Sequence, residues 1–596
     1  MVRASFAGFS TALSAIQASQ KRLDITGQNL ANMNTPGYTR QQLEVSSVTY
    51  THPVSHYMNG SEVMVGYGVH MDKVSQIRDP YLDAQYRSQM RKSGYTDSMQ
   101  TSLDRLSSFL DESHVNGIHS AFDDIRATLQ NMQDLGKVND PVFEAQLRSR
   151  MQALTNLLND ADRQITKAEQ EEFTRLDGTG TNENGAVQEV NDILRQIGLL
   201  NRQIKENQIF GQQSLELMDE RNLLLDKLSS YIPIEVTYYK DPDHDGIKNG
   251  TANTVDKDEL YDHDYMGNII GRQDWPDDLR VEMVYQDENG VTQKLTLVEG
   301  TIGAGEANFG QLEITNGSLE DPTAAEITFT GASTWDKQNN GTAQAAVSVV
   351  FGKDAAGKVT NQFPSDSGSI QASLDMLWKD GKTAGSSDVN GYEFYRNQLN
   401  NLARSFAHVI NTINIQGNQN KTNPPPDEWF LLANKDDMSK DGITAGNIGI
   451  NDAWSSGAVH VGNEGSSLSD TVLNLLEAMG TTYPMNPAKP GIGGNNNLLF
   501  DQTQVDLENN SFADFMNHVS TLLANDSYTN TNALKSNVIV LNGIQNSRDS
   551  ISGISLDEEA SNMMVYMSAY NAASRLMTAL DEALNTLINN TGLVGR

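Results

Sequence analysis

The chain contains 596 residues and no cysteine, and its formal net charge at pH 7 is -34. The length predicts three or four domains, with enough apolar residues to give each a core. The lack of cysteine excludes disulfides, thiolate metal ligands and a cysteine nucleophile. Because phosphate binding needs clustered Lys and Arg, the negative charge argues against nucleic acid as a partner. No apolar run approaches the roughly 18 residues of a membrane span, so we predict no membrane insertion.

The first thirty residues predict one helix of about 28 residues, which is about 40 Å long at 1.5 Å per residue. Its apolar side chains fall on alternating steps of three and four residues, which is typical of a coiled-coil seam. The seam runs through Val2, Phe6, Phe9, Leu13, Ile16, Gln20, Leu23, Gly27 and Leu30, and its predicted contact residues are Phe9, Leu13, Ile16, Leu23 and Leu30. Serine and glycine residues interrupt what would be the apolar part of a secretory signal, so we predict that no signal peptide is cleaved.

A turn follows this helix in the stretch NLANMNTPGY, residues 29–38. Pro36 lacks a backbone donor and disfavours helical geometry at the residue before it. Gly37 suits the positive φ of a type II turn, and Asn32 and Asn34 suit a helix end. We predict that these four residues form the turn that terminates the helix.

The middle of the chain changes from helical to β-type patterning. Residues 81–231 predict several helices separated by Asp-Pro or Gly-rich breaks. From Ile234 onward, short alternating or β-branched stretches predict strands at IPIEVTYY, LRVEMVY, QKLTLVEG, QLEITNG, AEITFTG and AAVSVVF. Helical patterning returns at GSIQASLDMLW, YEFYRNQLNNLARSFAHVINTIN, SDTVLNLLEAM and FADFMNHVSTLLAN.

The last helix is predicted to begin near Ser555, because three acidic residues follow this candidate N-cap at the positive end of the helix dipole. It carries two adjacent apolar stripes, which together are wide enough to contact two neighbours. Its predicted contact residues are Met563, Tyr566, Tyr570, Leu576, Leu580, Leu584 and Leu587. A single amphipathic helix is most often an ordinary core helix, but two at opposite ends of a chain favour pairing of the termini.

The predicted fold class is mainly α with an inserted β domain. The terminal helices pair in a coiled-coil-like domain, a helical bundle forms the middle domain, and the β-rich domain is exposed. We place the N-terminal half of the inner domain, with an extended segment, at 1–80 and its C-terminal half at 531–596. The helical domain occupies 81–232 and 367–530, with an irregular segment at 417–510, and the β-rich domain occupies 233–366.

Two segments partly match ligand-binding motifs. GKDAAGKV, residues 352–359, has the Gly and Lys spacing of a phosphate-binding loop, but Val359 stands where Ser or Thr is required and no helix follows. We therefore interpret it as a hairpin turn. Asp241, Asp243 and Asp245 match the first positions of a calcium loop, but Ala252 replaces its final bidentate carboxylate. We favour a solvated acidic turn there, with calcium binding as the minor alternative.

Catalytic patterns find no match in the sequence. The ten histidines form no HExxH pair, and no GxSxG nucleophile motif occurs. We predict no enzyme activity, no cofactor and no metal site. The enzyme alternative is a cell-wall hydrolase associated with a surface appendage.

Several stretches resemble the bacterial flagellar rod, hook and hook-associated proteins. GQNLANMNTPGYTRQ is similar to the N-terminal signature of that family, and SLDEEASNMMVYMSAYNAASRLMTALDEALNTLINNTGLVGR is similar to the C-terminal segment of its hook-associated members. MVGYGVHMDKVSQIRDPYLDAQYR, LELMDERNLLLDKLS and GYEFYRNQLNNLARSFAHVINTIN also resemble them. The resemblance covers both ends and the helical core, whereas the β domain and residues 417–510 carry no recognised motif.

The resemblance implies a structural assembly protein of the flagellum that forms the junction connecting hook to filament. It also implies terminal helices that line a central channel, export to the extracellular flagellum without a cleaved signal, and ordering on assembly. The implied partners are like subunits in a ring, the hook protein, a second junction protein on the filament side, and a cytosolic export chaperone at the C-terminal helix. The alternatives are another axial subunit of hook or rod type and a non-flagellar extracellular adhesin.

Overall fold

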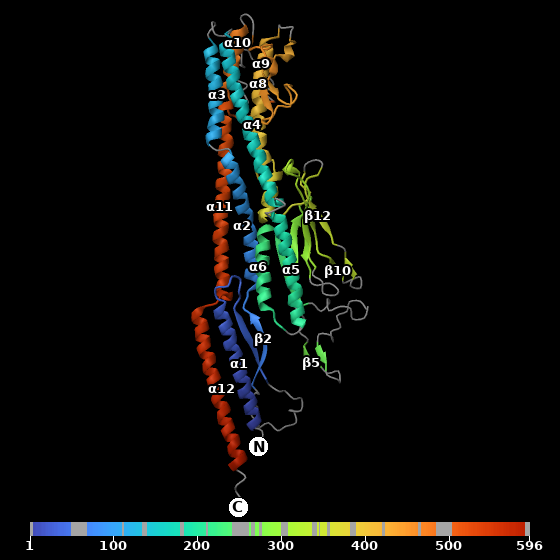
Figure 1. Cartoon of the computed structure of the whole chain (residues 1–596), viewed down its shortest axis with the longest axis vertical. Helices are drawn as coiled ribbons and strands as arrows, with labels where there is room; N and C mark the ends of the chain where they lie inside the picture. The colour runs from blue at the N-terminus through green and yellow to red at the C-terminus, as the bar shows by residue number, and fades with distance from the viewer. Residues whose placement is uncertain are drawn as a thin grey trace, which may run out of the picture.

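The molecule is an elongated rod that carries both chain ends at one end and a β-rich unit on one side (Figure 1). The computed structural model describes residues 4–48, 68–109, 112–133, 140–178, 184–209, 212–240, 261–263, 269–272, 277–299, 308–336, 342–344, 346–354, 358–381, 389–419, 424–462, 467–483 and 504–590. All structural statements below concern these residues.

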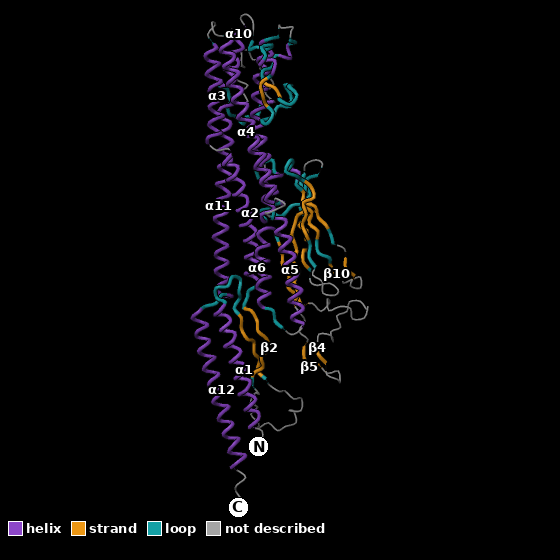
Figure 2. The backbone as a smooth tube through the Cα atoms, in the orientation of Figure 1, coloured by secondary structure: helices purple, strands orange, loops and turns teal. Residues whose placement is uncertain are grey.

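Long helices form the rod and run nearly along its axis (Figure 2). The helices are α1 (Ala4–Ala31), α2 (Pro80–Phe109), α3 (Glu112–Met132), α4 (Pro141–Asp177), α5 (Ala186–Ile209), α6 (Leu215–Tyr231), α7 (Gly368–Trp378), α8 (Tyr392–Gly417), α9 (Asp452–Ser455), α10 (Ser467–Met479), α11 (Phe512–Ser552) and α12 (Leu556–Asn590). The 41 residues of α11 span about 60 Å, so this helix alone runs from the far end of the rod to the point where α12 begins (Figure 1).

The strands form small antiparallel sheets in three places. The hairpin of β1 (Gln41–Ser47) and β2 (Val69–Gln76) stands beside α1 (Figure 1). The β-rich unit between α6 and α7 contains the sheets β3-β6-β7 and β12-β9-β8 and the pairs β4-β5 and β10-β11, and β13 pairs with β14 near the far end. Their bounds are β3 (Ile234–Lys240), β4 (Tyr261–His263), β5 (Ile269–Arg272), β6 (Asp277–Gln286), β7 (Thr292–Val298), β8 (Gln311–Asn316), β9 (Glu326–Thr330), β10 (Thr334–Asp336), β11 (Thr342–Gln344), β12 (Ser348–Phe351), β13 (Leu432–Asn434) and β14 (Ile448–Ile450).

The hydrophobic core runs through the shaft of the rod and into the β-rich unit. In the shaft, the ring of Phe122 lies 5.3 Å from that of Phe406 and 6.0 Å from that of Phe512, which joins α3, α8 and α11. In the β-rich unit, Phe351 packs between Phe329 and Phe363 at ring distances of 4.6 and 4.7 Å. Aromatic clusters of this kind add directional packing to apolar burial, so they fix how these elements sit against one another.

The six strands predicted from the sequence are present as β3, β6, β7, β8, β9 and β12, and the chain is mainly helical as expected. Ser555 directly precedes α12, which confirms the predicted start of that helix. Among the helices within residues 81–231, α4 is the longest and runs over 37 residues from Pro141 to Asp177. The hairpin β1-β2 lies in a stretch for which the sequence predicts no strands.

The largest departure is α11, for which periodicity predicted only residues 512–525. Beyond Leu523 the helix is rich in Asn, Thr and β-branched residues, which are weak helix formers. Its polar side chains instead bind the neighbouring helix: Asn530 donates to the carbonyl of Thr96 at 2.9 Å, and Gln89 donates to Asn537. These contacts with α2 stabilise a helix that its own propensity does not favour. The helix α11 therefore continues without a break across residue 531, where the sequence analysis places the start of the C-terminal half of the inner domain. That domain boundary stays a prediction.

A buried carboxylate joins α4 to α8. Glu169 is almost fully buried and accepts a hydrogen bond of 2.6 Å from Arg396, while its other oxygen, Oε1, has no hydrogen-bond partner in the described structure. Burial raises the pKa of Glu169 to about 7, although Arg396 opposes this shift. The folded chain therefore holds a proton on Glu169 between about pH 4.5 and pH 7 that the unfolded chain releases.

Stability should fall across this pH range, because the folded state binds more protons than the unfolded state. We expect Glu169→Gln to remove this dependence on pH. The free energy of unfolding of the variant minus that of the wild type should therefore rise by on the order of 3 kcal/mol from pH 5 to pH 8. Urea unfolding at several pH values measures the difference, with Glu171→Gln as control on the same helix, where the side chain is 42% exposed. A difference that stays constant with pH contradicts the assignment.

Candidate assembly interface

The helix α1 ends in a tight turn made by the residues that follow it. The backbone N–H and the side chain of Asn32 both donate to the carbonyl of Gln28, and the N–H of Thr35 donates to the carbonyl of Asn32. The N–H of Tyr38 then donates to the carbonyl of Thr35 at 3.2 Å across Pro36 and Gly37, whose φ is +79°. This arrangement matches a type II turn, in which the third residue needs a positive φ. Asn34 is exposed.

The segment that begins with the last residue of this turn, Tyr38–Gln41, binds four helices, and we call it the joint segment. Gln41 exchanges two backbone hydrogen bonds of 3.0 Å with the buried side chain of Asn29 in α1, and the hydroxyl of Tyr38 donates to the same amide. Burial raises the pKa of Tyr38 to about 12, and nearby carboxylates add to the shift. The amide of Asn29 thus fixes the direction in which the chain leaves α1.

Thr39 connects the joint segment to α6. Its N–H and hydroxyl donate to the carboxylate of Asp219 at 3.0 and 2.6 Å. Arg78 lies 3.5 Å from the same carboxylate and forms an ion pair of 3.0 Å with Asp83 of α2. Because Thr39 and Asp219 are both buried, these partners satisfy a carboxylate that would be costly to bury alone.

Arg40 connects the joint segment to α11 and α12. Its N–H donates to the carbonyl of Ser552 at the end of α11, while its guanidinium binds Glu558 and Glu559 at 2.8 Å each. Glu559 is 2% exposed, whereas Glu558 is 62% exposed. The pair with Glu559 therefore dominates, because exposed ion pairs contribute little.

Further buried ion pairs surround the joint segment. Asp226 of α6 accepts from Arg87 at 2.9 Å and from Arg548 of α11 at 2.7 Å. Arg548 also lies 3.5 Å from Asp83, and its guanidinium carbon is 4.4 Å from the ring centre of Tyr86. Three helices thus share one charged cluster at the point where the terminal helices leave the shaft.

The first and last helices lie side by side and run antiparallel (Figure 1). Leu580 lies against Gly8, where a methyl group would come within 3.3 Å of it, and Arg22 lies 5.4 Å from the ring centre of Tyr566. The apolar side chains of α12 that are partly or fully buried follow alternating steps of three and four residues. We call them the inner seam: Met563, Tyr566, Tyr570, Ala573, Met577, Leu580 and Leu584. This seam takes members from both predicted stripes.

The predicted contact residues divide into two groups. Partly buried in the single chain are Phe9, Ile16, Leu23, Leu30, Met563, Tyr566, Tyr570, Leu580 and Leu584. Leu13, Leu576 and Leu587 are instead 49%, 47% and 62% exposed. Leu576 belongs to an uninterrupted apolar line on the solvent side of α12, which we call the outer seam: Val565, Ala569, Ala572, Leu576, Ala579 and Ala583. All six residues are exposed and follow steps of four and three.

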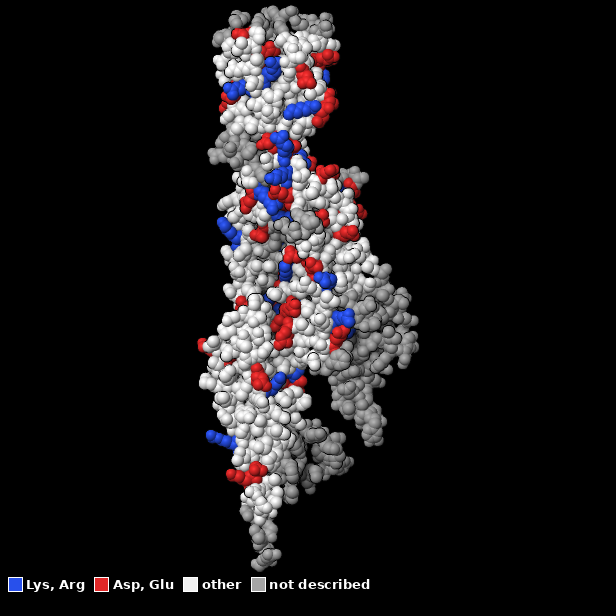
Figure 3. Space-filling view, viewed as in Figure 1, with Lys and Arg blue, Asp and Glu red and all other residues white. Residues whose placement is uncertain are grey.

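The C-terminal helices contribute little to the core of the single chain. The five buried residues of α11 all lie within Phe512–Leu523, and within the described part of α12 only Glu559 and Ala573 are buried. Lys535 is the one charged residue between Asp526 and Arg548, and residues 560–574 carry no charge. Figure 3 shows this end of the molecule as largely uncharged surface. An exposed, neutral and apolar-rich surface of this length is typical of a protein interface.

The other candidate sites give no competing function. Lys353 pairs with Val359, and the N–H of Asp354 donates to the carbonyl of Lys358, so the described residues of GKDAAGKV pair as the two arms of a hairpin. The calcium candidates Asp241, Asp243 and Asp245 lie outside the described residues. Within the described ranges no cluster of three His, Asp or Glu side chains is arranged to hold a metal ion, and no helix there has the length and apolarity to span a membrane.

The sequence did not single out Asn29, Arg40, Asp219 or Glu559 as functional residues. In the sequence, Glu559 is one of three consecutive acidic residues that suit the positive end of the helix dipole. The neighbouring residues do not indicate which of the three carboxylates is buried. The sequence feature that points to this site is the position of Arg40. It lies three residues after Gly37, within the stretch GQNLANMNTPGYTRQ that resembles the flagellar family.

Three family descriptions match parts of the chain. "Flagellar hook-associated protein FlgK helical domain" matches residues 103–306, "Flagella basal body rod protein" matches 9–39, and "Flagellar basal body rod FlgEFG protein C-terminal" matches 545–590. The two rod-protein descriptions thus fall on α1 with its turn and on α12 with the end of α11.

The chain is also similar to whole proteins. It is 25% identical over 593 residues to flagellar hook-associated protein 1 of Bacillus subtilis, covering 99% of both chains. It is 21% identical over 596 residues to flagellar hook-associated protein 1 of Escherichia coli, covering 97% of this chain and 99% of that protein. Among solved structures, the flagellar hook junction protein FlgK of Burkholderia pseudomallei matches with a TM-score of 0.35 and 18% identity, over 59% of this chain and 46% of that chain.

Removing the Arg40 side chain should loosen α12, because it leaves the buried carboxylate of Glu559 without its cation. We expect Arg40→Ala to cost about 1 to 3 kcal/mol of local stability. Arg575 is the one Lys or Arg between residues 549 and 595, so tryptic cleavage there reports opening of α12. The cleavage rate should rise roughly 5- to 150-fold. Lys73→Ala, which removes an exposed pair with Glu44, serves as control. Equal cleavage rates in wild type and Arg40→Ala would refute the role of Arg40.

Proposed function

We infer that this chain, which belongs to the flagellar hook-associated protein 1 family, is a structural subunit of the junction between the flagellar hook and filament. The similarity to proteins of that name extends over almost the whole chain. The family descriptions that match its two ends are those of flagellar rod proteins, as expected for an axial subunit.

The observation that carries this proposal is the surface of residues 524–590. This length of α11 and α12 is helical except at residues 553–555, is uncharged over 536–547 and 560–574, and has only Glu559 and Ala573 buried among its described side chains. Large apolar side chains exposed on it include Tyr528, Ile539, Val565 and Leu576. A monomer gains nothing from such a surface, whereas a subunit packed among copies of itself buries it.

We propose that copies of the chain form a closed ring in which α1 and α12 make a coiled-coil-like inner domain. The antiparallel contact of α1 with α12 and the alternating steps of the inner seam support this packing. The joint segment would hold that domain at a set angle to the shaft. The β-rich unit, which projects from the side of the rod, would face outward (Figure 1).

The function we propose is mechanical, with no enzyme chemistry. We propose that this subunit lies in the extracellular part of the flagellum and that it is exported without cleavage of a signal. The hook protein and a second junction protein would contact the two ends of the ring. The exposed apolar face of α12 would need cover before assembly, which supports a cytosolic export chaperone as a further partner.

A strain that lacks this chain should build hooks without attached filaments and should release flagellin into the medium. Electron microscopy of the cells and immunoblots of the culture fluid measure both effects. Normal filaments in the deletion strain would contradict the proposed function.

Complementation with variants tests the surface itself. Leu576→Asp should fold with a stability within about 0.5 kcal/mol of wild type, because the side chain is 47% exposed, yet it should fail to restore filaments. Leu319→Asp, on a side chain that is 55% exposed beside the β-rich unit, should restore them. Full complementation by Leu576→Asp would argue against α12 as the contact surface.

A further inference from the structure

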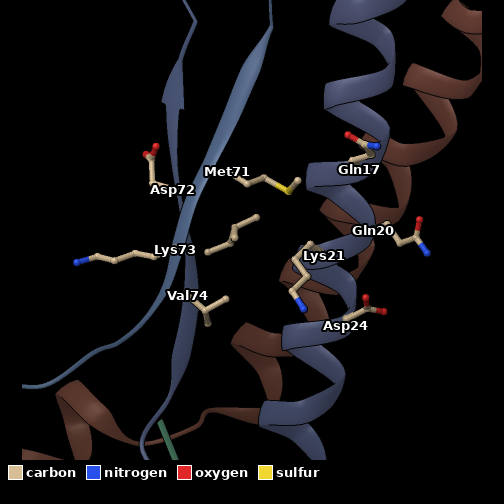
Figure 4. Close-up of a pocket in the computed structure, with 9 residues that line it drawn as sticks. Gln17, Gln20, Lys21, Asp24, Met71, Asp72, Lys73 and Val74 are labelled. Atoms are coloured by element: carbon tan, nitrogen blue, oxygen red, sulfur yellow. The ribbon is translucent and has the colours of Figure 1, made fainter. Parts of the chain in front are cut away.

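A groove separates α1 from the β1-β2 hairpin on the side of α1 away from α12 (Figure 4). Its volume is about 410 Å³. Apolar side chains of Leu43, Met71 and Val74 form its hairpin wall, and Figure 4 shows Met71 directed toward α1. Met71 is 37% exposed, and the α1 wall opposite it is polar, formed by Gln17, Gln20, Lys21 and Asp24. The hairpin wall of the groove therefore presents apolar surface to solvent.

A β-bulge produces this wall. Glu44 pairs with Lys73 while Val45 pairs with Met71, so Asp72 is an extra residue without a partner across the hairpin. The extra residue shifts the alternation of side chains by one position, which places Met71 and Val74 on the same face of β2. In a regular strand these two residues would face opposite sides. The hairpin thus turns two apolar side chains toward α1 but does not close against it.

The outer seam of α12 is the complementary feature of the same molecule. Val565 and Leu576 are its larger side chains, and alanines at the other positions allow a close approach. Because α1 lies between α12 and the hairpin, the outer seam and the groove are on different sides of α1 (Figure 1). The groove of one chain therefore cannot receive the outer seam of that same chain.

We propose that the groove between α1 and the β1-β2 hairpin receives the outer seam of α12 from a second copy of this chain. This inference rests on the proposed function and specifies its subunit contact. The contact is heterologous, since different surfaces of the two copies meet, and repeating it closes a ring when the rotation between subunits allows. Each subunit then gives one α12 to a neighbour and receives one from the other side.

The dimensions of the two surfaces agree. The groove follows α1 from Gln17 to Asp24, about 10 Å along the helix, and the part of the outer seam from Ala569 to Leu576 spans the same length of about 10 Å on α12. A volume near 410 Å³ is in the range of ligand-sized pockets, so it admits side chains rather than a whole helix. Leu576 would enter the groove while Ala569 and Ala572 lie along its edges.

The charges also agree. The edges of the groove carry two lysines and two aspartates: Lys21, Lys73, Asp24 and Asp72. The groove is therefore neutral overall, as is the outer seam, and a pairing of the two carries no net repulsion within a chain of charge -34. Arg575 and Glu582 flank the outer seam and can meet edge groups of the opposite sign.

Disulfide trapping tests this contact directly, because the chain has no cysteine of its own. Met71→Cys and Leu576→Cys are made as two separate chains and expressed together in the deletion strain. Mild oxidation of isolated hook-filament structures should link one chain of each kind, which gel electrophoresis detects as a dimer that reduction reverses. Neither substitution alone should affect folding, since both side chains are substantially exposed.

The matched control replaces Leu576→Cys with Met567→Cys, which is 57% exposed on the other flank of α12. Efficient linking of Met71→Cys to Leu576→Cys, with little linking to Met567→Cys, supports the proposal. Preferred linking to Met567→Cys, or no linking in structures that contain both chains, overturns it while the proposed function stands. Absence of the chains from the isolated structures would instead count against the proposed function.

Discussion

The structure depends on the buried ion pairs and hydrogen bonds of the joint segment. Four consecutive residues bind α1 through Asn29, α6 through Asp219, and α11 and α12 through Arg40. The contacts with α6, α11 and α12 join parts of the chain that are far apart in sequence, and Arg40 and Glu559 are separated by 519 positions. Because buried charges are costly without partners, these groups are satisfied together only in one arrangement of the helices. The joint segment thus fixes the terminal helices relative to the shaft.

This constraint separates the molecule into two parts with different physical roles. The shaft, built around α4, α8 and the first turns of α11, is held by aromatic and aliphatic burial and is stable within one chain. The terminal helices are held mainly by their mutual contact and by the joint segment, and they leave apolar surface exposed. A subunit organised this way can present its assembly surface in a defined direction before any neighbour is present.

The sequence predicted those features that local chemistry decides. Apolar periodicity located α1 and α12, and the Pro36-Gly37 pair located the turn after α1. It could not predict the extent of α11, whose Asn530 and Asn537 are stabilised by contacts with α2 that a single-sequence pattern does not contain. It also could not distinguish the inner from the outer seam, because both are apolar lines on one helix. Only the position of α1 decides which line is covered.

The central claim is that assembly buries the surface of residues 524–590. Hydrogen exchange of this protein, free in solution and within isolated hook-filament structures, tests that claim most directly. The account predicts that amides of α12 and of the second half of α11 exchange much more slowly in the assembled form, while amides of α4 and α8 are protected in both. Equal exchange of α12 in the free and assembled forms would contradict the account.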